Sequence, residues 1–200
     1  MSNEGYKILI VGVGGQGVLL ASEILCEVAM GAGFDVKKSE VHGMSQRGGV
    51  VSSHVKIAPK VYSPTIEYGQ ADVLISFEQA EGLRALDWMR KDGVAIVSTT
   101  AMVPAIVTSS KLFSYPDDAV ATMKQKTDSV IAVEADRIAC ELGNPRLVNT
   151  ILLGVLSTHM SFDAELWLEA IRKRVKERFV DINLKAFEHG RQLKAAEATA

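Results

Sequence analysis

The chain has 200 residues, of which 48% are hydrophobic and 23% charged, and its formal net charge is −2. The length suits one α/β domain spanning residues 1–200, and the near-neutral charge gives no electrostatic case for binding nucleic acid or an anionic membrane. No stretch approaches the roughly 18 consecutive apolar residues that a membrane-spanning helix needs, and the polar N-terminus does not resemble a signal peptide, so we expect a cytoplasmic protein.

The first informative feature is a strand, a glycine-rich turn and a helix in that order. Residues 7–11 are apolar apart from the leading lysine and predict a strand, and helical spacing of apolar residues predicts a helix over about 16–30. The glycines between them fit the pattern G-x-G-x-x-G, in which the first helical turn offers free N–H groups and a positive dipole end to an anion. Four glycines exceed what a tight turn requires, which favours binding of a phosphate or another anion. The candidate ligand-binding residues are Gly12, Gly14, Gly15, Gln16 and Gly17.

The second predicted strand, residues 34–41, carries charges that suggest a nucleotide. Together with the first strand and helix it predicts a βαβ start. An acidic residue at its end, Glu40, would suit the ribose hydroxyls of a dinucleotide. Lys37 and Lys38 instead suit a phosphorylated ribose, as in NADP or the 3′-phosphate of coenzyme A. The alternative is a solvated strand end with paired charges.

A polar loop follows this strand at residues 41–49. Hydroxyl, amide and guanidinium donors are crowded beside two glycines, and a loop that follows the second strand should lie at the same edge of the sheet as the glycine turn. Arg47 is well suited to hold a phosphate or carboxylate. The candidate ligand-binding residues of this loop are Ser45, Gln46, Arg47, Gly48 and Gly49.

The rest of the chain alternates strands and helices. The alternation over residues 50–57 predicts a half-exposed strand that is antiparallel or near the sheet edge, with His54 at its surface or facing a neighbouring strand. Further strands are expected at 72–77, 94–98 and 130–133, an irregular stretch with a small β-excursion at 105–115, and helices at 79–91, 116–126, 134–142, 147–158, 163–176 and 181–197. This order predicts a three-layer α/β/α fold around a mostly parallel, Rossmann-like mixed sheet. A basic run at residues 172–178 is either a solvated helix face or a docking site for an acidic partner.

Cysteine and histidine usage excludes several sites. Cys26 and Cys140 both fall in predicted helices among apolar residues, which favours buried, inert thiols. Two cysteines cannot ligate an iron–sulfur cluster, and the four histidines lack metal-ligand spacing. We therefore expect no metal site, and no residue is assigned a catalytic role.

Two motifs together carry a family resemblance. Residues 12–17, Gly-Val-Gly-Gly-Gln-Gly, and residues 40–56, which begin Glu-Val-His-Gly-Met-Ser-Gln-Arg-Gly-Gly, resemble the gamma-type subunit or domain of 2-oxoacid:ferredoxin oxidoreductases. Within that family, the resemblance is to the subunits of enzymes that act on indolepyruvate and related aryl pyruvates. It extends over nearly the whole chain.

This resemblance implies an enzyme subunit that is inactive alone. The family decarboxylates a 2-oxoacid oxidatively with thiamine diphosphate, forms an acyl-coenzyme A and passes electrons through iron–sulfur clusters to ferredoxin. In the indolepyruvate type, a larger alpha subunit carries the thiamine diphosphate and the [4Fe-4S] clusters, and this chain would complete the shared cleft and hold coenzyme A or substrate. The resemblance leaves homodimerisation open.

Three alternative functions are also compatible with parts of the sequence. Within the family, the chain could be the gamma subunit of a pyruvate, 2-ketoisovalerate or 2-oxoglutarate oxidoreductase. Outside it, the glycine motif and the two lysines would fit a stand-alone NADP-dependent dehydrogenase, although no hydride-transfer constellation such as Tyr-x-x-x-Lys is found. The third alternative is a non-catalytic scaffold whose glycine loops shape only an interface.

Overall fold

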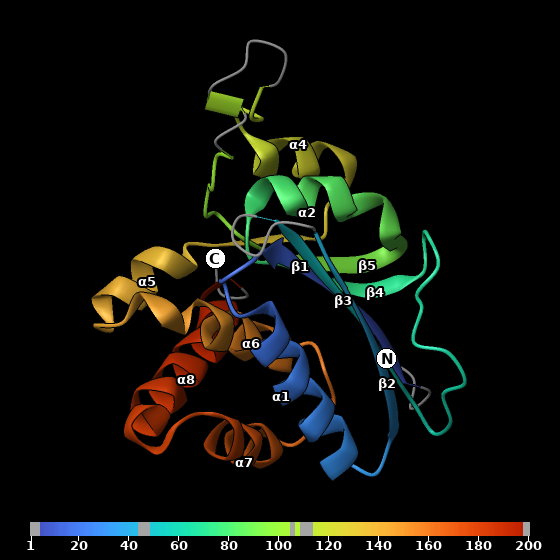
Figure 1. Ribbon diagram of the computed structural model, residues 1–200, viewed down its shortest axis with the longest axis vertical. Helices are drawn as coiled ribbons and strands as arrows, with labels where there is room; N and C mark the ends of the chain where they lie inside the picture. Colours follow the sequence, from blue (N-terminus) through green and yellow to red (C-terminus); the bar gives the residue numbers. More distant parts are fainter. Residues whose placement is uncertain (1–4, 44–48, 105–106, 109–113, 198–200) are drawn as a thin grey trace.

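The computed structural model describes residues 5–43, 49–104, 107–108 and 114–197, and these form three layers (Figure 1). A six-stranded sheet in the order β2-β3-β1-β4-β5-β6 separates α2 and α4 on one face from α1, α6, α7 and α8 on the other. The strands are β1 (Tyr6–Val13), β2 (Asp35–His42), β3 (Val50–Ala58), β4 (Ala71–Ser76), β5 (Met89–Ser98) and β6 (Val130–Val133). The helices are α1 (Val18–Gly31), α2 (Gln79–Ala85), α4 (Ala119–Lys126), α5 (Ala135–Glu141), α6 (Val148–Ser157), α7 (Ala164–Arg174) and α8 (Val180–Glu197), with short 3₁₀ helices η1 (Leu86–Trp88), η2 (Pro145–Leu147) and η3 (Glu177–Phe179).

The direction of the strands explains where the site can lie. β1, β4, β5 and β6 are mutually parallel, whereas β3 is antiparallel to both β1 and β2. β2 therefore runs in the same direction as β1, and both strands end at the same edge of the sheet. This confirms the expected mixed, mostly parallel α/β fold. The predicted βαβ start is confirmed, since α1 joins two parallel strands of one sheet, and β3 lies between those strands.

The strand β3 is antiparallel, as one of the two sequence-based alternatives has it, but it is an inner strand and most of its side chains are buried or half-buried. His54 is only 8% exposed, its Nδ1 accepts a hydrogen bond from the backbone N–H of Ile66 at 3.2 Å, and its ring packs edge-on against Trp88. Burial, and secondarily the charge of Lys56, lowers the pKa of His54 below its ordinary value. His54 is thus covered by the chain that follows β3, a contact between distant residues that periodicity does not reveal.

Alternate side chains of the central strand fill two separate cores. Ile8 and Ile10 of β1 pack in the core shared with α1 and α6, whereas Leu9 and Val11 pack in the core under α2. All four are no more than 5% exposed, and burial of such a side chain contributes about 1.5–3 kcal/mol. The apolar run at 7–11 is thus explained by a strand covered on both faces.

The boundary between α2 and β5 lies earlier than predicted. The helix expected at 79–91 ends with η1 at Trp88, and β5 begins at Met89 because that residue pairs with Ala71 across a register shift in the β4–β5 ladder. Gly93 lies inside β5. A Cβ at Gly93 would stand 2.6 Å from Met89 Cγ and 2.9 Å from the carbonyl oxygen of Ala71, so this irregular stretch of strand needs a glycine.

The helix α6 is buried along its whole length, as its apolar sequence predicts. It lies between the sheet and α8, and two glycines allow the two helices to approach closely. A Cβ at Gly154 would stand 2.2 Å from the carbonyl oxygen of Phe187, and one at Gly190 would stand 2.1 Å from that of Ile151. This crossing fixes the position of α6, whose first turn lies beside the glycine turn.

Candidate functional site

The two glycine-rich segments meet at one edge of the sheet. The backbone N–H of Gly14 donates a hydrogen bond to the carbonyl oxygen of Gly49 at 2.9 Å, and the N–H of Gly43 donates to that of Val50 at 2.7 Å. The turn after β1 and the described ends of the β2–β3 loop are therefore joined by main-chain bonds. Their proximity is as the sequence predicts.

The glycine turn presents an uncapped helix N-terminus. Gly15 and Gly17 have left-handed backbone angles, φ +102° and +90°, which favour glycine. Gly17 is the N-cap of α1 but has no side chain to accept from the first helical turn, and that turn holds no acidic residue. A Cβ at Gly15 would meet no atom within 4 Å, so this part of the backbone can be approached closely. The first N–H groups of α1 are left for solvent or an anion.

Gln16 has a different role from the one its sequence context suggests. Its Oε1 accepts from the backbone N–H of Val13 at 2.7 Å, and its Nε2 donates to the carbonyl oxygen of Phe77 at 2.9 Å. The side chain thus ties the turn after β1 to the end of β4. Gly12 lies under this tie, because a Cβ there would stand 2.9 Å from both Gln16 Oε1 and the Phe77 Cβ.

A cleft of about 660 Å³ lies at this edge. Its walls are glycine backbone and apolar side chains, with a single imidazole. Leu19 is 36% exposed here, and Val50, on the strand that faces the cleft, is 42% exposed. The lining residues are Val13, Gly14, Gly15, Gly17, Val18, Leu19, Leu20, His42, Gly43 and Val51. Apolar walls beside unsatisfied N–H groups suit a ligand that carries an anionic group on a less polar body.

Four of the ten candidate ligand-binding residues, Ser45, Gln46, Arg47 and Gly48, lie outside the described residues. The other six are placed at the rim: Gly14, Gly15 and Gly17 line the cleft, Gln16 and Gly12 support the turn, and Gly49 accepts from Gly14. That these residues bind a ligand remains a prediction.

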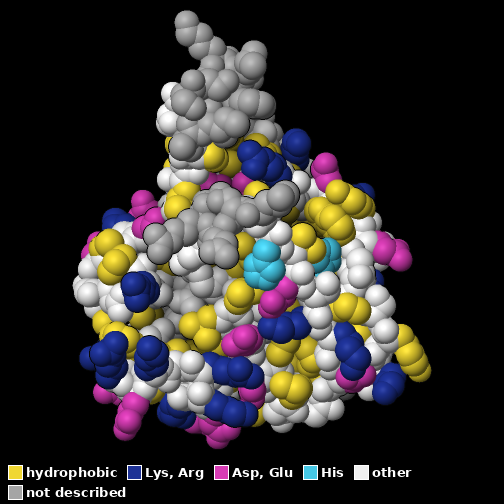
Figure 2. All heavy atoms as spheres, in the orientation of Figure 1, with side chains coloured by type: hydrophobic (Ala, Val, Ile, Leu, Met, Phe, Trp, Pro, Cys, Tyr) yellow, Lys and Arg dark blue, Asp and Glu magenta, His cyan; other side chains and the backbone are white. Residues whose placement is uncertain are grey.

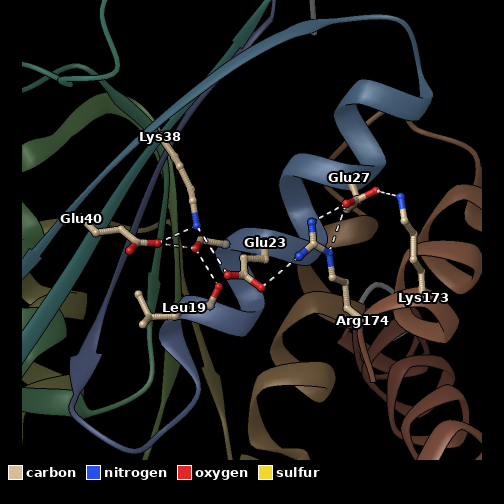
Figure 3. Close-up of polar contacts among 8 residues, drawn as sticks. Leu19, Glu23, Glu27, Lys38, Glu40, Lys173 and Arg174 are labelled. Atoms are coloured by element: carbon tan, nitrogen blue, oxygen red, sulfur yellow. Dashed lines mark hydrogen bonds and ion pairs between the residues drawn. The ribbon is translucent and has the colours of Figure 1, made fainter. Parts of the chain in front are cut away.

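The charges of β2 are paired with one another. Lys38 Nζ lies 2.7 Å from Glu40 Oε1 and 4.0 Å from Glu23 of α1 (Figure 3). Lys37 Nζ lies 3.0 Å from Asp35 Oδ1. Partial burial raises the pKa of Glu40, but the hydrogen bonds from Lys38 and Ser22 and the charges of Lys38 and His42 together outweigh it, so the pKa lies below its ordinary value. Of the two interpretations of this strand end, the structure therefore agrees with the one in which its charges are paired with each other. It offers Lys38 and Glu40 internal partners rather than a ribose.

The basic run after residue 171 is also largely paired within the chain. Lys173 Nζ lies 2.7 Å from Glu27 Oε2, and Arg174 bridges Glu23 and Glu27, so α7 is bound to α1 (Figure 3). The hydrogen bonds from Lys173 and Arg174 lower the pKa of Glu27. Figure 2 shows dark blue and magenta side chains interleaved over the helical half of this face. The ion pairs between α1 and α7 account for the charges of Lys173 and Arg174 without an acidic partner.

The same edge continues at the ends of β4 and β5 with a closed polar network. Glu78 is 1% exposed and caps α2, with its Oε2 accepting a hydrogen bond from the N–H of Glu81 at 2.9 Å. Its Oε1 accepts from the N–H of Met102 at 3.2 Å and from the hydroxyl of Tyr115. Burial, and then this hydrogen bond, raises the pKa of Tyr115 to about 12. Glu78 thereby joins the two ends of the segment between β5 and α4.

The two cysteines differ from each other. Cys26 is half-buried, and desolvation raises the pKa of its thiol to about 11, as expected of an inert thiol. Cys140 is exposed, so its predicted burial is wrong: it lies on the outer face of α5. Among the described residues, no three His, Cys, Asp or Glu side chains are grouped to hold a metal ion, and no helix is long and apolar enough to cross a membrane.

One neighbour of the glycine turn was not assigned to the site from the sequence. Asn149, in the first turn of α6, is 4% exposed, and a Cβ at Gly17 would stand 3.2 Å from its Nδ2. Its Oδ1 accepts from the N–H of Thr150 at 2.9 Å. The amide inside an otherwise apolar helix is the only signal in the sequence that could have indicated a polar neighbour.

Comparison with known proteins gives a consistent family. The model of the family described as pyruvate ferredoxin/flavodoxin oxidoreductase matches residues 7–193. The chain is 41% identical over 188 residues to indolepyruvate oxidoreductase subunit IorB of Archaeoglobus fulgidus, covering 92% of each chain. It is 37% identical over 197 residues to the subunit of that name from Pyrococcus horikoshii, covering 96% of each.

A solved structure has the same fold. The gamma subunit of keto/oxoacid ferredoxin oxidoreductase from Geobacter sulfurreducens superposes with a TM-score of 0.68 at 25% sequence identity, covering 92% of this chain and 95% of that one. The similarity therefore extends over both complete folds.

Proposed function

The chain belongs to the pyruvate ferredoxin/flavodoxin oxidoreductase family and is a subunit of a 2-oxoacid:ferredoxin oxidoreductase, and from that premise we propose that its 2-oxoacid is indolepyruvate or a related aryl pyruvate. The choice of substrate is supported by the relatives that share 37–41% of their residues with this chain over at least 92% of its length, both of which are named for indolepyruvate. The enzyme would decarboxylate the oxoacid, transfer the acyl group to coenzyme A and deliver two electrons to ferredoxin.

The proposal divides the chemistry between two subunits. Thiamine diphosphate and [4Fe-4S] clusters would reside on a larger alpha subunit, because a cluster takes four cysteine ligands and this chain has two cysteines in all. Those are placed on α1 and α5, one half-buried with a raised pKa and the other exposed. When bound to the partner, the thiamine group would supply the electron sink for decarboxylation.

This chain would hold an anionic part of coenzyme A at the glycine rim. The observation that carries this proposal is the hydrogen bond from Gly14 to Gly49, which brings both glycine-rich segments to one cleft beside an uncapped helix. The N–H groups at the start of α1 would receive a phosphate, and Arg47 would add a charge-assisted contact. The apolar side of the cleft, with Leu19 and Val51, would exclude water from the less polar part of the ligand.

Reconstitution tests the proposal. The chain would be co-produced with an alpha subunit that carries the thiamine and cluster motifs, and ferredoxin reduction would be followed with indolepyruvate and coenzyme A. We expect no turnover from the lone chain and turnover from the complex. Reduction of an acceptor by the lone chain with a 2-oxoacid, or faster turnover of the complex with pyruvate than with indolepyruvate, would contradict the proposal.

The role of the glycine rim is tested separately with the substitution Arg47→Ala. A complex that assembles normally but has a KM for coenzyme A raised about tenfold would support ligand binding, since a charge-assisted contact contributes about 1.5–3 kcal/mol. Loss of assembly would instead indicate a scaffold. Arg172→Ala is the matched control, because Arg172 lies on α7 and, among the described residues, forms an ion pair only with Glu165, at 2.8 Å.

A further inference from the structure

Three lysines lie side by side across three neighbouring strands, near the edge of the sheet opposite the glycine rim. Lys37 of β2 is directly opposite Lys56 of β3, and Lys56 is directly opposite Lys7 of β1. Directly opposed residues of antiparallel strands present their side chains on the same face, and like charges in such pairs are destabilising. This lysine row (Lys37, Lys56 and Lys7) is therefore an arrangement that the stability of the sheet does not favour.

Among the described residues, the two flanking lysines have partners and the central one, Lys56, has none. Lys37 Nζ lies 3.0 Å from Asp35 Oδ1, and Lys7 Nζ donates to the amide oxygen of Gln70 at 3.2 Å. Within the part of the chain that the structure describes, Lys56 has neither a hydrogen bond nor an ion pair to its side chain. The charge at the centre of the row is thus uncompensated.

Lys7 and Lys56 open into a cavity of about 840 Å³, which lies between β1, the end of β3 and the start of β5. Its charged lining comprises Lys7, Lys56, Lys60, Arg90, Asp72 and Asp92. Asp72 is already engaged, since one oxygen accepts from the backbone N–H of Lys7 at 2.7 Å and the other lies 2.9 Å from Arg90 Nε. The cavity therefore carries an excess of positive charge and has room for a small organic molecule.

An aromatic side chain is available at the same cavity. Tyr62 lines it and is 90% exposed, with Ser63 beside it. The exposed face of an aromatic side chain can stack with a flat ring of a ligand. The lining thus combines ammonium groups for phosphates with an aromatic face for a base.

We propose that this cavity binds a nucleotide-like small molecule with at least two phosphate groups, the phosphates lying on Lys7 and Lys56 and the ring on Tyr62. The concave shape favours a small molecule over an acidic protein surface. The cavity lies about 25 Å from the glycine rim, the length of the eight-residue strand β1. The proposal is therefore independent of the coenzyme A site proposed above.

Calorimetric titration of the full chain with ADP and with pyrophosphate tests this site. We expect both to bind, more weakly as ionic strength rises, and Lys56→Gln to weaken both about tenfold by removing a charge-assisted contact. Tyr62→Ala should weaken ADP and leave pyrophosphate unchanged. Lys124→Gln, on the exposed face of α4, is the control and should change neither.

Thermal unfolding adds a readout that a purely structural lysine would not give. Without ligand, Lys56→Gln should raise Tm because it relieves the opposition with Lys7 and Lys37, and it should abolish most of the rise in Tm that pyrophosphate causes in the wild-type chain. Lys7→Gln serves as a second variant should Lys56→Gln fail to fold.

Further experiments establish which nucleotide binds and whether it binds in this cavity. If coenzyme A competes with ADP and the substitution Lys56→Gln weakens this competition, the ligand is the nucleotide half of coenzyme A. If coenzyme A does not compete, the ligand is a free nucleotide. Equal binding by wild type and Lys56→Gln, or loss of ADP binding in Arg47→Ala, would overturn the proposal. So would binding of an oligoglutamate peptide to a chain that binds neither ADP nor pyrophosphate.

Discussion

Replacing Gln16 with alanine tests how the glycine turn is held. Its side chain connects the N–H of Val13 with the carbonyl oxygen of Phe77 through bonds of 2.7 and 2.9 Å. Alanine would leave one donor and one acceptor without partners in a half-buried position. Since each such group costs about 1–3 kcal/mol, we expect the free energy of unfolding to fall by about 2–4 kcal/mol.

Urea unfolding of the isolated chain measures this loss of stability. A second substitution separates the contribution of the bond from Val13 from that of the bond to Phe77. Gln16→Glu keeps an oxygen for Val13 but faces the carbonyl oxygen of Phe77 with a carboxylate, so it should lose at least half as much stability as Gln16→Ala. Gln125→Ala, on the exposed face of α4, is the matched control. In the assembled complex, Gln16→Ala should also raise the KM for coenzyme A.

The reasoning would be refuted by a Gln16→Ala chain whose unfolding free energy lies within about 0.5 kcal/mol of the wild type, the range of ordinary surface substitutions. That result would mean that water replaces the side chain at no cost. Gln16 would then be free to contact a ligand, as its place in the motif first suggests.

Three further predictions concern packing and titration. Gly190→Ala should cost about 3 kcal/mol or more by urea unfolding, because its Cβ would collide with the carbonyl oxygen of Ile151; a change below 1 kcal/mol would contradict the close crossing of α6 and α8. At pH 8 a disulfide reagent should modify Cys140 rapidly and Cys26 slowly, since a pKa of about 11 leaves about 0.1% thiolate; equal rates would contradict the burial of Cys26. The pKa of His54 is lowered in the folded chain, so as the pH falls the unfolded chain binds a proton at this imidazole before the folded chain does. The free energy of unfolding should therefore fall as the pH drops through about 6.5. His54→Gln should weaken this dependence, and an unchanged profile would refute it.

The sequence predicts the layers of the fold well because the signals are local. The glycine turn ends an apolar strand and starts an apolar-faced helix, and the later strands and helices follow from periodicity and caps such as Asp163. Strand pairing is not local. Nothing in residues 34–57 reveals that β3 inserts between β2 and β1, and the boundary at Met89 depends on its pairing with Ala71.

The candidate site could be predicted in position but not in the role of each residue. That both glycine-rich segments share an edge follows from the direction of β1 and β2. The use of Gln16 as a tie to Phe77, and the contact of Asn149 with the turn, depend on tertiary geometry. The lysine row likewise appears only when register is known, because Lys7, Lys37 and Lys56 are separated by at least 19 residues in the sequence.

Hydrogen–deuterium exchange on the assembled complex tests most directly whether the glycine rim holds coenzyme A. The account predicts that coenzyme A slows exchange at the amides of residues 14–20 and 49–51, and that exchange in α7 stays unchanged. Protection confined to the alpha subunit, with residues 14–20 exchanging at the same rate with and without coenzyme A, would contradict it.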